Sequence, residues 1–119
     1  MALILVVDDS SFARKVTMKI LQASGHETIE ADNAEVCFEL LSGQNPEVIL
    51  LDMLMPGKGG LEILGELKEK NIVIPVIVQT ADIQESVKKQ CIDAGAACVV
   101  NKPPNMGELA KAIEAALGA

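Results

Sequence analysis

The fold is decided by the stretch Leu3-Ile4-Leu5-Val6-Val7-Asp8-Asp9-Ser10. Five aliphatic residues in a row are followed at once by two acids and a serine. An apolar run without polar alternation suits a strand that is covered on both faces, as in a parallel sheet. Acids placed directly after such a strand lie at the carboxyl edge of the sheet, where open parallel sheets bind their ligands.

Four further short runs have a similar strand character. They are residues 27–30, which are the weakest, and residues 47–51, 76–79 and 97–100. Between the first two runs, Ser10 can cap a helix whose apolar positions Phe12, Val16, Ile20 and Leu21 recur at three- and four-residue intervals. Gly25 stands where this helix should stop.

The remaining intervals also carry helix start and stop signals. Asn33 can cap a helix over residues 34–41, which Gly43 ends, and a third helix is expected roughly over residues 60–70. Asp82 and Glu85 form a capping-box pattern before a fourth helix, which Gly95 stops. Pro104 and Asn105 open the fifth helix. Strands that alternate with helices imply right-handed crossovers. We therefore expect a doubly wound α/β fold, with a five-stranded parallel sheet and five helices, in a single domain over residues 1–119.

Composition narrows the class of partner. The formal charge is −7, and Phe12 and Phe38 are the only aromatic residues among 119. An acidic chain with so few stacking groups is a poor nucleic-acid binder, so we expect no nucleic-acid partner. The longest apolar runs are far too short to span a bilayer, and no secretory signal is visible. We expect a cytoplasmic protein without a membrane span.

The three cysteines, Cys37, Cys91 and Cys98, show no close metal-type spacing. Their odd number in a reducing compartment predicts free, mostly buried thiols.

Polar residues fall at the ends of the predicted strands. Asp8 and Asp9 end the first, Asp52 the third and Thr80 the fourth, while Lys102 follows the fifth. The carboxyl ends of parallel strands share one edge, so these five residues should converge on one pocket.

Three carboxylates crowded together repel one another unless a cation neutralises them. Oxygen-only ligands favour Mg²⁺, with Mn²⁺ as the alternative. Asp52 can then act as a nucleophile that forms an aspartyl phosphate, and Lys102 and Thr80 can hold the phosphoryl oxygens. The glycine-rich loop over residues 55–60 would let backbone approach the metal and the phosphate.

Four segments together resemble the bacterial response-regulator receiver family, in order and at suitable spacing, over the whole chain. They are Val6-Val7-Asp8-Asp9-Ser10, Leu51-Asp52-Met53-Leu54-Met55-Pro56-Gly57, Gln79-Thr80-Ala81 and Asn101-Lys102-Pro103. The resemblance implies a flavodoxin-like sheet with strand order 2-1-3-4-5.

The resemblance also assigns roles within the site. It implies that Asp52 accepts a phosphoryl group from a sensor histidine kinase, a histidine phosphotransfer protein or a small phosphodonor. Asp8, Asp9 and Asp52, with the backbone carbonyl of Leu54, would hold the metal. Thr80 and Lys102 would contact the phosphoryl group. The Lys102-Pro103 peptide bond is expected to be cis.

Two positions depart from the family pattern. Val99 occupies the position where the family usually has an aromatic residue, whose side-chain rotamer changes with phosphorylation. Pro104 occupies a position where the family frequently has Phe. Both concern signal output, which the resemblance places on the surface of the fourth helix, fifth strand and fifth helix. Because the chain ends just after the fifth helix, we expect no effector domain and an output through protein binding. In this respect the chain resembles the chemotaxis-type regulators, which bind a motor or an enzyme, and equally the shuttle proteins of phosphorelays.

Three other functions are open to test. A dehalogenase-like aspartyl-phosphate phosphatase would need a second Asp two positions after the nucleophile, where this chain has Leu54. A dinucleotide-binding role needs a glycine-rich turn after the first strand, where this chain has Asp8-Asp9-Ser10. A receiver that no longer responds to phosphorylation would keep the fold and only bind partners, a reading that Val99 keeps open. We therefore expect a phosphoacceptor signalling module and no turnover of external substrates.

Overall fold

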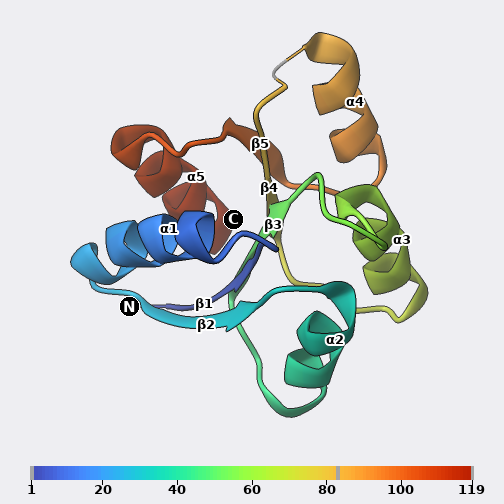
Figure 1. The fold of residues 1–119 in the computed structure, drawn as a ribbon, viewed down its shortest axis with the longest axis horizontal. Coiled ribbons are helices and arrows are strands. Elements are labelled where there is room, and N and C mark those ends of the chain that lie inside the picture. The colour runs from blue at the N-terminus through green and yellow to red at the C-terminus, as the bar shows by residue number, and fades with distance from the viewer. Residues whose placement is uncertain (1, 83, 119) are drawn as a thin grey trace.

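The computed structural model describes residues 2–82 and 84–118, over which five strands alternate with five helices (Figure 1). The strands and helices in chain order are β1 (Leu3–Val7), α1 (Ser11–Ala23), β2 (Glu27–Ala31), α2 (Ala34–Gly43), β3 (Val48–Asp52), α3 (Gly60–Glu69), β4 (Val76–Thr80), α4 (Glu85–Asp93), β5 (Cys98–Asn101) and α5 (Met106–Gly118). None of these helices is long and apolar enough to cross a bilayer.

All strand pairs are parallel, and the strand order is β2-β1-β3-β4-β5, as predicted. Every predicted strand is present within one residue of its expected position. Strands β3 and β4 each run one residue further than predicted, to Asp52 and Thr80. These two polar residues are thus the last members of their strands, and in β4 the polar Gln79 directly precedes Thr80.

Helices cover both faces of the sheet. Helices α1 and α5 lie on one face, and α2, α3 and α4 lie on the other (Figure 1). Each layer has its own hydrophobic cluster, because successive residues of a strand point to opposite faces. Ile4, Val6 and Leu50 pack toward α1 and α5. Leu5 and Leu51 belong to the cluster under α2, α3 and α4.

The caps of the first two helices are as predicted. Ser10 accepts a hydrogen bond from the Ala13 amide, and Asn33 accepts one from the Val36 amide. Such caps satisfy amides that the first helical turn leaves unpaired. Gly25 and Gly95, predicted to stop helices, both have positive φ values of 88° and 114°, a region that favours glycine.

Two predicted helix ends are wrong. The second helix does not end before Gly43 but includes it, and Gln44 is the C-cap. The third helix runs from Gly60 to Glu69 with Lys70 as its C-cap, in agreement with the approximate range predicted. The fourth helix begins at Glu85 with Gln84 as its N-cap, so Asp82 is not the cap.

The predicted last helix does follow Asn105, whose Oδ1 accepts the Glu108 amide at 3.0 Å.

The apolar residues of helix α1 differ in how deeply they are buried. Leu21 is buried with Thr17, whereas the Phe12 side chain is 78% exposed. The three cysteines are free, with Cys37 and Cys91 buried and Cys98 half-buried.

Candidate functional site

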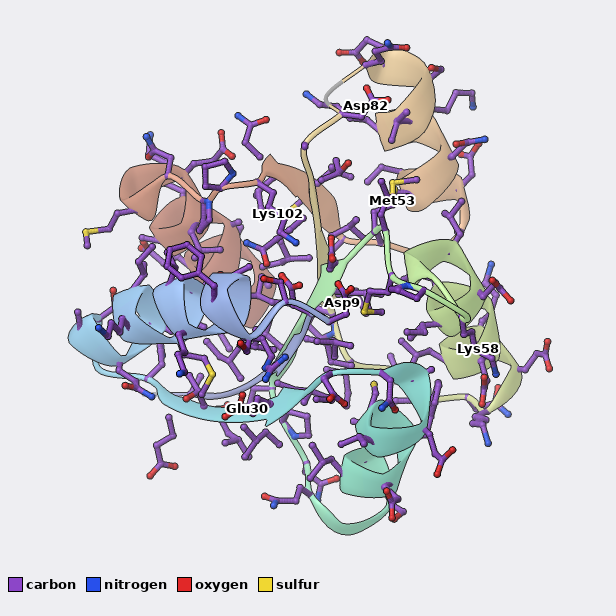
Figure 2. All side chains as sticks on the ribbon, in the orientation of Figure 1. Asp9, Glu30, Met53, Lys58, Asp82 and Lys102 are labelled. Carbon is purple, nitrogen blue, oxygen red and sulfur yellow. The ribbon has the colours of Figure 1, made fainter. Side chains whose placement is uncertain are left out.

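The predicted site residues meet at the carboxyl edge of the sheet. Asp8 follows β1, Asp52 ends β3, Thr80 ends β4 and Lys102 follows β5. Figure 2 shows Asp9 and Lys102 near the carboxyl ends of the central strands. Asp8, Asp52 and Thr80 are buried, whereas Asp9 is exposed.

Lys102 bridges the two buried carboxylates. Its Nζ lies 2.9 Å from Oδ2 of Asp8 and 3.0 Å from Oδ2 of Asp52. Asp9 completes an acidic group in which one carboxylate oxygen from each of Asp8, Asp9 and Asp52 lies within 4.8 Å of the others. One cation therefore faces three carboxylates, which leaves an excess of negative charge.

The pKa values of the pair reflect this crowding. Burial is the largest cause of the raised pKa of Asp52, and the nearby charge of Asp8 adds to it. The hydrogen bond from Lys102 acts in the opposite direction without cancelling the rise. For Lys102, burial alone would lower the pKa, but its hydrogen bonds to Asp8 and Asp52 outweigh burial and raise it. The ammonium group is therefore held in its charged form.

The donor set fits a hard divalent cation. Three carboxylates offer oxygen ligands, and repulsion among them is the reason a cation would be bound. Mg²⁺ binds through one or two carboxylates and keeps several waters, which suits a group with one exposed and two buried members. Leu54, the predicted carbonyl ligand, has a 75% exposed side chain, and its backbone hydrogen bond to Asp52 acts to lower the pKa of that carboxyl group.

Backbone packing around Asp52 requires glycine at position 60. A Cβ built on Gly60 would lie 2.9 Å from the Asp52 carbonyl oxygen and 2.9 Å from the Met53 Cα. The Gly60 amide donates to the Met53 carbonyl at 2.9 Å. The start of α3 is thereby held directly against the end of β3.

Thr80 and Lys102 are joined through the backbone. The Lys102 amide donates to the Thr80 carbonyl at 3.0 Å, and the following Lys102-Pro103 peptide bond is cis, as expected. The Thr80 Oγ1 accepts the Asp82 amide at 3.0 Å, two residues before the helix cap. Thr80 therefore lies at the base of the loop into α4.

Three residues with supporting positions were not singled out in the sequence. Arg14 donates from Nη1 to the Asp8 carbonyl at 2.7 Å, and Glu108 accepts the Asn101 amide at 2.9 Å, one residue before Lys102. Neither has a sequence signal, because both are ordinary charged residues of helices. Gln79 does have one, because it is a polar residue inside an apolar strand. It is buried, and its Nε2 is the one buried side-chain nitrogen or oxygen without a partner in the part of the chain that the structure describes.

Comparison with known proteins gives consistent matches. The chain is 34% identical over 116 residues to the phosphate regulon transcriptional regulatory protein PhoB of Pseudomonas aeruginosa, a match that covers 96% of this chain and 51% of PhoB. It is 32% identical over 100 residues to the chemotaxis protein CheY of Halobacterium salinarum, covering 84% of this chain and 83% of CheY. The crystal structure of the receiver domain of NtrX from Brucella abortus superimposes with a TM-score of 0.91 at 30% identity, covering 98% of each chain.

The matched relatives differ in length. The chain spans about half of the PhoB proteins and 27% of the cyclic di-GMP phosphodiesterase of Thermotoga maritima, to which it is 36% identical. Each of these matches covers only a part of the longer relative. Residues 4–114 match the family model described as the response regulator receiver domain, and this chain therefore belongs to the receiver domain family of two-component response regulators.

Proposed function

We propose that the chain, as one receiver domain over residues 1–119, accepts a phosphoryl group on Asp52 with the help of Mg²⁺ and signals through protein binding. The observation that carries the proposal is the position of Lys102, which bridges Asp8 and Asp52 at 2.9 and 3.0 Å. Phosphorylation-dependent signalling is general for the family, and receiver domains generally bind Mg²⁺ at an acidic pocket.

Asp52 is suited to nucleophilic attack on phosphorus. Asp52 is 4% exposed at the end of a strand, so the position of its carboxylate is fixed before a donor arrives. Carboxylates form aspartyl phosphates in this way in other proteins. Asp8 and Asp9 would hold Mg²⁺ together with Asp52 and the Leu54 carbonyl, and Mn²⁺ could replace it. The ion, when bound, supplies positive charge next to the transferred phosphoryl group.

Lys102 and Thr80 would bind the remaining phosphoryl oxygens. Lys102 stays charged because its pKa is raised by Asp8 and Asp52, and a fixed cation stabilises the charge of the phosphoryl group during transfer. The Thr80 hydroxyl already accepts the Asp82 amide, so it has a proton free to donate. Its position at the base of the loop into α4 is suited to couple phosphorylation to that loop.

Intact-mass spectrometry after treatment with acetyl phosphate and Mg²⁺ tests the acceptor. Wild-type protein should gain the mass of one phosphoryl group, and Asp52→Asn should not. Glu114→Gln, an exposed acid on α5, serves as the matched control and should gain the mass as wild type does. Equal phosphorylation of Asp52→Asn and wild type would show that Asp52 is not the acceptor.

The phosphodonor proposed for this site is a sensor histidine kinase or a histidine phosphotransfer protein. The output surface proposed is the face of α4, β5 and α5, where Ile92 and Met106 are exposed apolar side chains. Binding assays with phosphorylated and unphosphorylated protein, using Ile92→Ser and Met106→Ser, would test this face. Unchanged affinity for a target in both variants would contradict it.

A further inference from the structure

Gln79 carries a buried amide that the proposed phosphorylation chemistry does not use. The residue is 1% exposed, and its Nε2 has no hydrogen-bond partner within residues 2–82 and 84–118. Buried polar groups of folded proteins are nearly always paired, because an unmet donor raises the free energy of the folded state. A residue that lowers stability in this way is expected where it serves function.

The sheet places Gln79 beside Asp52. The two residues are register partners on the neighbouring strands β4 and β3, and the Gln79 carbonyl accepts the Met53 amide at 3.0 Å. Register partners of a sheet point to the same face, and neighbouring strands lie about 4.8 Å apart. The register partner of Gln79 on β5 is Val100, which is aliphatic. Of the two partners, only Asp52 therefore offers a side-chain acceptor.

In the unphosphorylated site, Lys102 holds the Asp52 carboxylate. Lys102 follows β5, and β4 lies between β5 and β3, so the lysine side chain crosses β4 to reach Asp52. Its Nζ lies 3.0 Å from Oδ2 of Asp52 and 2.9 Å from Oδ2 of Asp8. A charged donor binds a carboxylate more strongly than a neutral amide does. The lysine thus satisfies Asp52, and the Gln79 amide beside it is left unpaired.

Phosphorylation changes this arrangement. One Asp52 oxygen forms a bond to phosphorus, while the leaving group of the donor departs with the electron pair of the bond that breaks. Lys102 then binds phosphoryl oxygens, as proposed above, and the other Asp52 oxygen becomes a carbonyl acceptor that has lost the lysine. The terminal amide torsion of glutamine is broad, so the Gln79 amide can turn toward this oxygen within its rotamer.

We propose that Gln79 is a positioning residue that donates from Nε2 to the Asp52 carbonyl oxygen once Asp52 is phosphorylated, and so favours the phosphorylated state. The inference rests on the proposed phosphorylation of Asp52. The unmet donor of Gln79 and the acceptor freed on Asp52 pair with each other only in the modified protein. An equilibrium between two states is shifted by interactions that differ between them, and this hydrogen bond is such a difference.

Beryllofluoride with Mg²⁺ is a stable mimic of a phosphoryl group on a carboxylate, and calorimetric titration gives its affinity. Gln79→Met keeps the length of the side chain without the donor, and it should bind the mimic about tenfold more weakly than wild type. In chelator, the same variant should be more stable to urea than wild type, because the unmet donor is gone. These effects have opposite signs, whereas a residue that only supports the fold would lose affinity and stability together.

Ile77→Val is the matched control, because Ile77 is buried two residues earlier on the same strand and face and has no side-chain donor. Its affinity for beryllofluoride should equal that of wild type. NMR of side-chain amides gives a direct signature of the proposed bond. The Gln79 amide protons, identified by their absence in Gln79→Met, should shift downfield and exchange more slowly with water when the mimic binds.

Equal affinity of wild type and Gln79→Met for the mimic, or amide resonances that do not respond to it, would overturn the role of Gln79 while leaving Asp52 as the acceptor. Lower stability of Gln79→Met in chelator would also overturn it, because the amide would then be paired in the resting state. Failure of wild type to bind beryllofluoride, or binding that is equally tight in Asp52→Asn, would instead show that the proposed function is wrong.

Discussion

At the scale of single residues, the burial of Asp52 opposes its ionisation. The carboxyl group lies next to Asp8, and Lys102 does not fully offset the two effects, so the pKa of Asp52 is raised. A raised pKa means that the folded protein favours the protonated form more than the unfolded chain does. The contribution of this group to stability is therefore complete below the unfolded value of 3.8 and is lost as pH rises through the folded value.

We predict that Asp52→Asn stabilises the protein at neutral pH in the presence of a chelator. The amide of asparagine has nearly the shape of the Asp52 carboxylate but carries no charge, so the substitution removes a buried charge. The free energy of unfolding should rise by about 0.5 to 2 kcal/mol. The gain should shrink as pH falls toward 3.8. Urea unfolding at several pH values measures it, with Glu114→Gln as the exposed control. A lower stability of Asp52→Asn at pH 7 would contradict this account.

Gln79 is a second buried residue whose polar side chain is poorly matched to its surroundings. Its unpaired Nε2 lies in the interior, and a buried donor without a partner costs about 1 to 3 kcal/mol. Gln79 lies between Asp52 and Val100 on the two neighbouring strands. Ile77 precedes it by two residues, so it points to the same face of the sheet, and it packs in the cluster under α1 and α5. The Gln79 side chain therefore points into an aliphatic layer.

Gln79→Leu should accordingly raise the free energy of unfolding by about 1 kcal/mol or more. Leucine keeps most of the volume and has no polar atom to satisfy. Urea denaturation gives the change from the midpoint, provided that the slope is unchanged. Gln22→Leu, on the surface of α1, is the control and should shift the midpoint little. A loss of stability in Gln79→Leu would indicate that an internal water pairs with the amide.

At the scale of elements, the loop into α4 separates Thr80 from the helix. Asp82 accepts the Gln84 amide at 3.1 Å and donates its own amide to Thr80, so two short-range hydrogen bonds define the loop. Val99 is half-buried against the cluster on the same side of the sheet as α4. It is branched at Cβ and restricted at χ1, so it offers no large ring to move between buried and exposed positions.

We therefore expect phosphorylation to act through the backbone of residues 80–86, of which Ile83 lies outside the described residues. Hydrogen exchange with and without a phosphoryl mimic should show its largest change there, because a coupled element must differ between the two states. The central segment of α2 is an internal control. A change confined to β5 and α5, with residues 80–86 unaffected, would exclude this route.

These elements also show where sequence reasoning succeeded and where it failed. Strand ends were predictable to within one residue because aliphatic runs stop at polar residues, as at Val7, although β3 runs one residue past Leu51 to Asp52. The start of α4 was not, because the Asp82 side chain bonds to an amide two residues on instead of capping the helix. The exposure of Phe12 was equally hidden, since it depends on where α1 sits relative to α5 and the segment after Lys102. Helical spacing places a residue on a helix face but does not reveal what covers that face.

At the scale of the whole molecule, binding of a cation at the acidic edge should stabilise the fold. The three carboxylates come from the ends of two neighbouring strands, so an ion that binds them is bound only when β1 and β3 are paired. A ligand that binds only the folded state raises stability as its concentration rises.

The melting temperature should therefore increase from chelator to excess Mg²⁺. A Mg²⁺-free buffer brought to the same ionic strength with NaCl separates specific binding of Mg²⁺ from general screening. Asp9→Asn should reduce the shift, because Asp9 is the exposed member of the group. An identical melting temperature with chelator and with excess Mg²⁺ would count against a metal site at Asp8, Asp9 and Asp52.

The division of the interior into two hydrophobic clusters has a consequence for how such a protein diversifies. The clusters under α1 and α5 and under α2, α3 and α4 share no residue, because the sheet separates them. A substitution that reshapes one helical layer leaves the packing of the other largely intact. Duplicated copies of this gene thus have a route to change the helices of one face and those of the other in separate evolutionary steps, with the residues at the strand ends unchanged throughout.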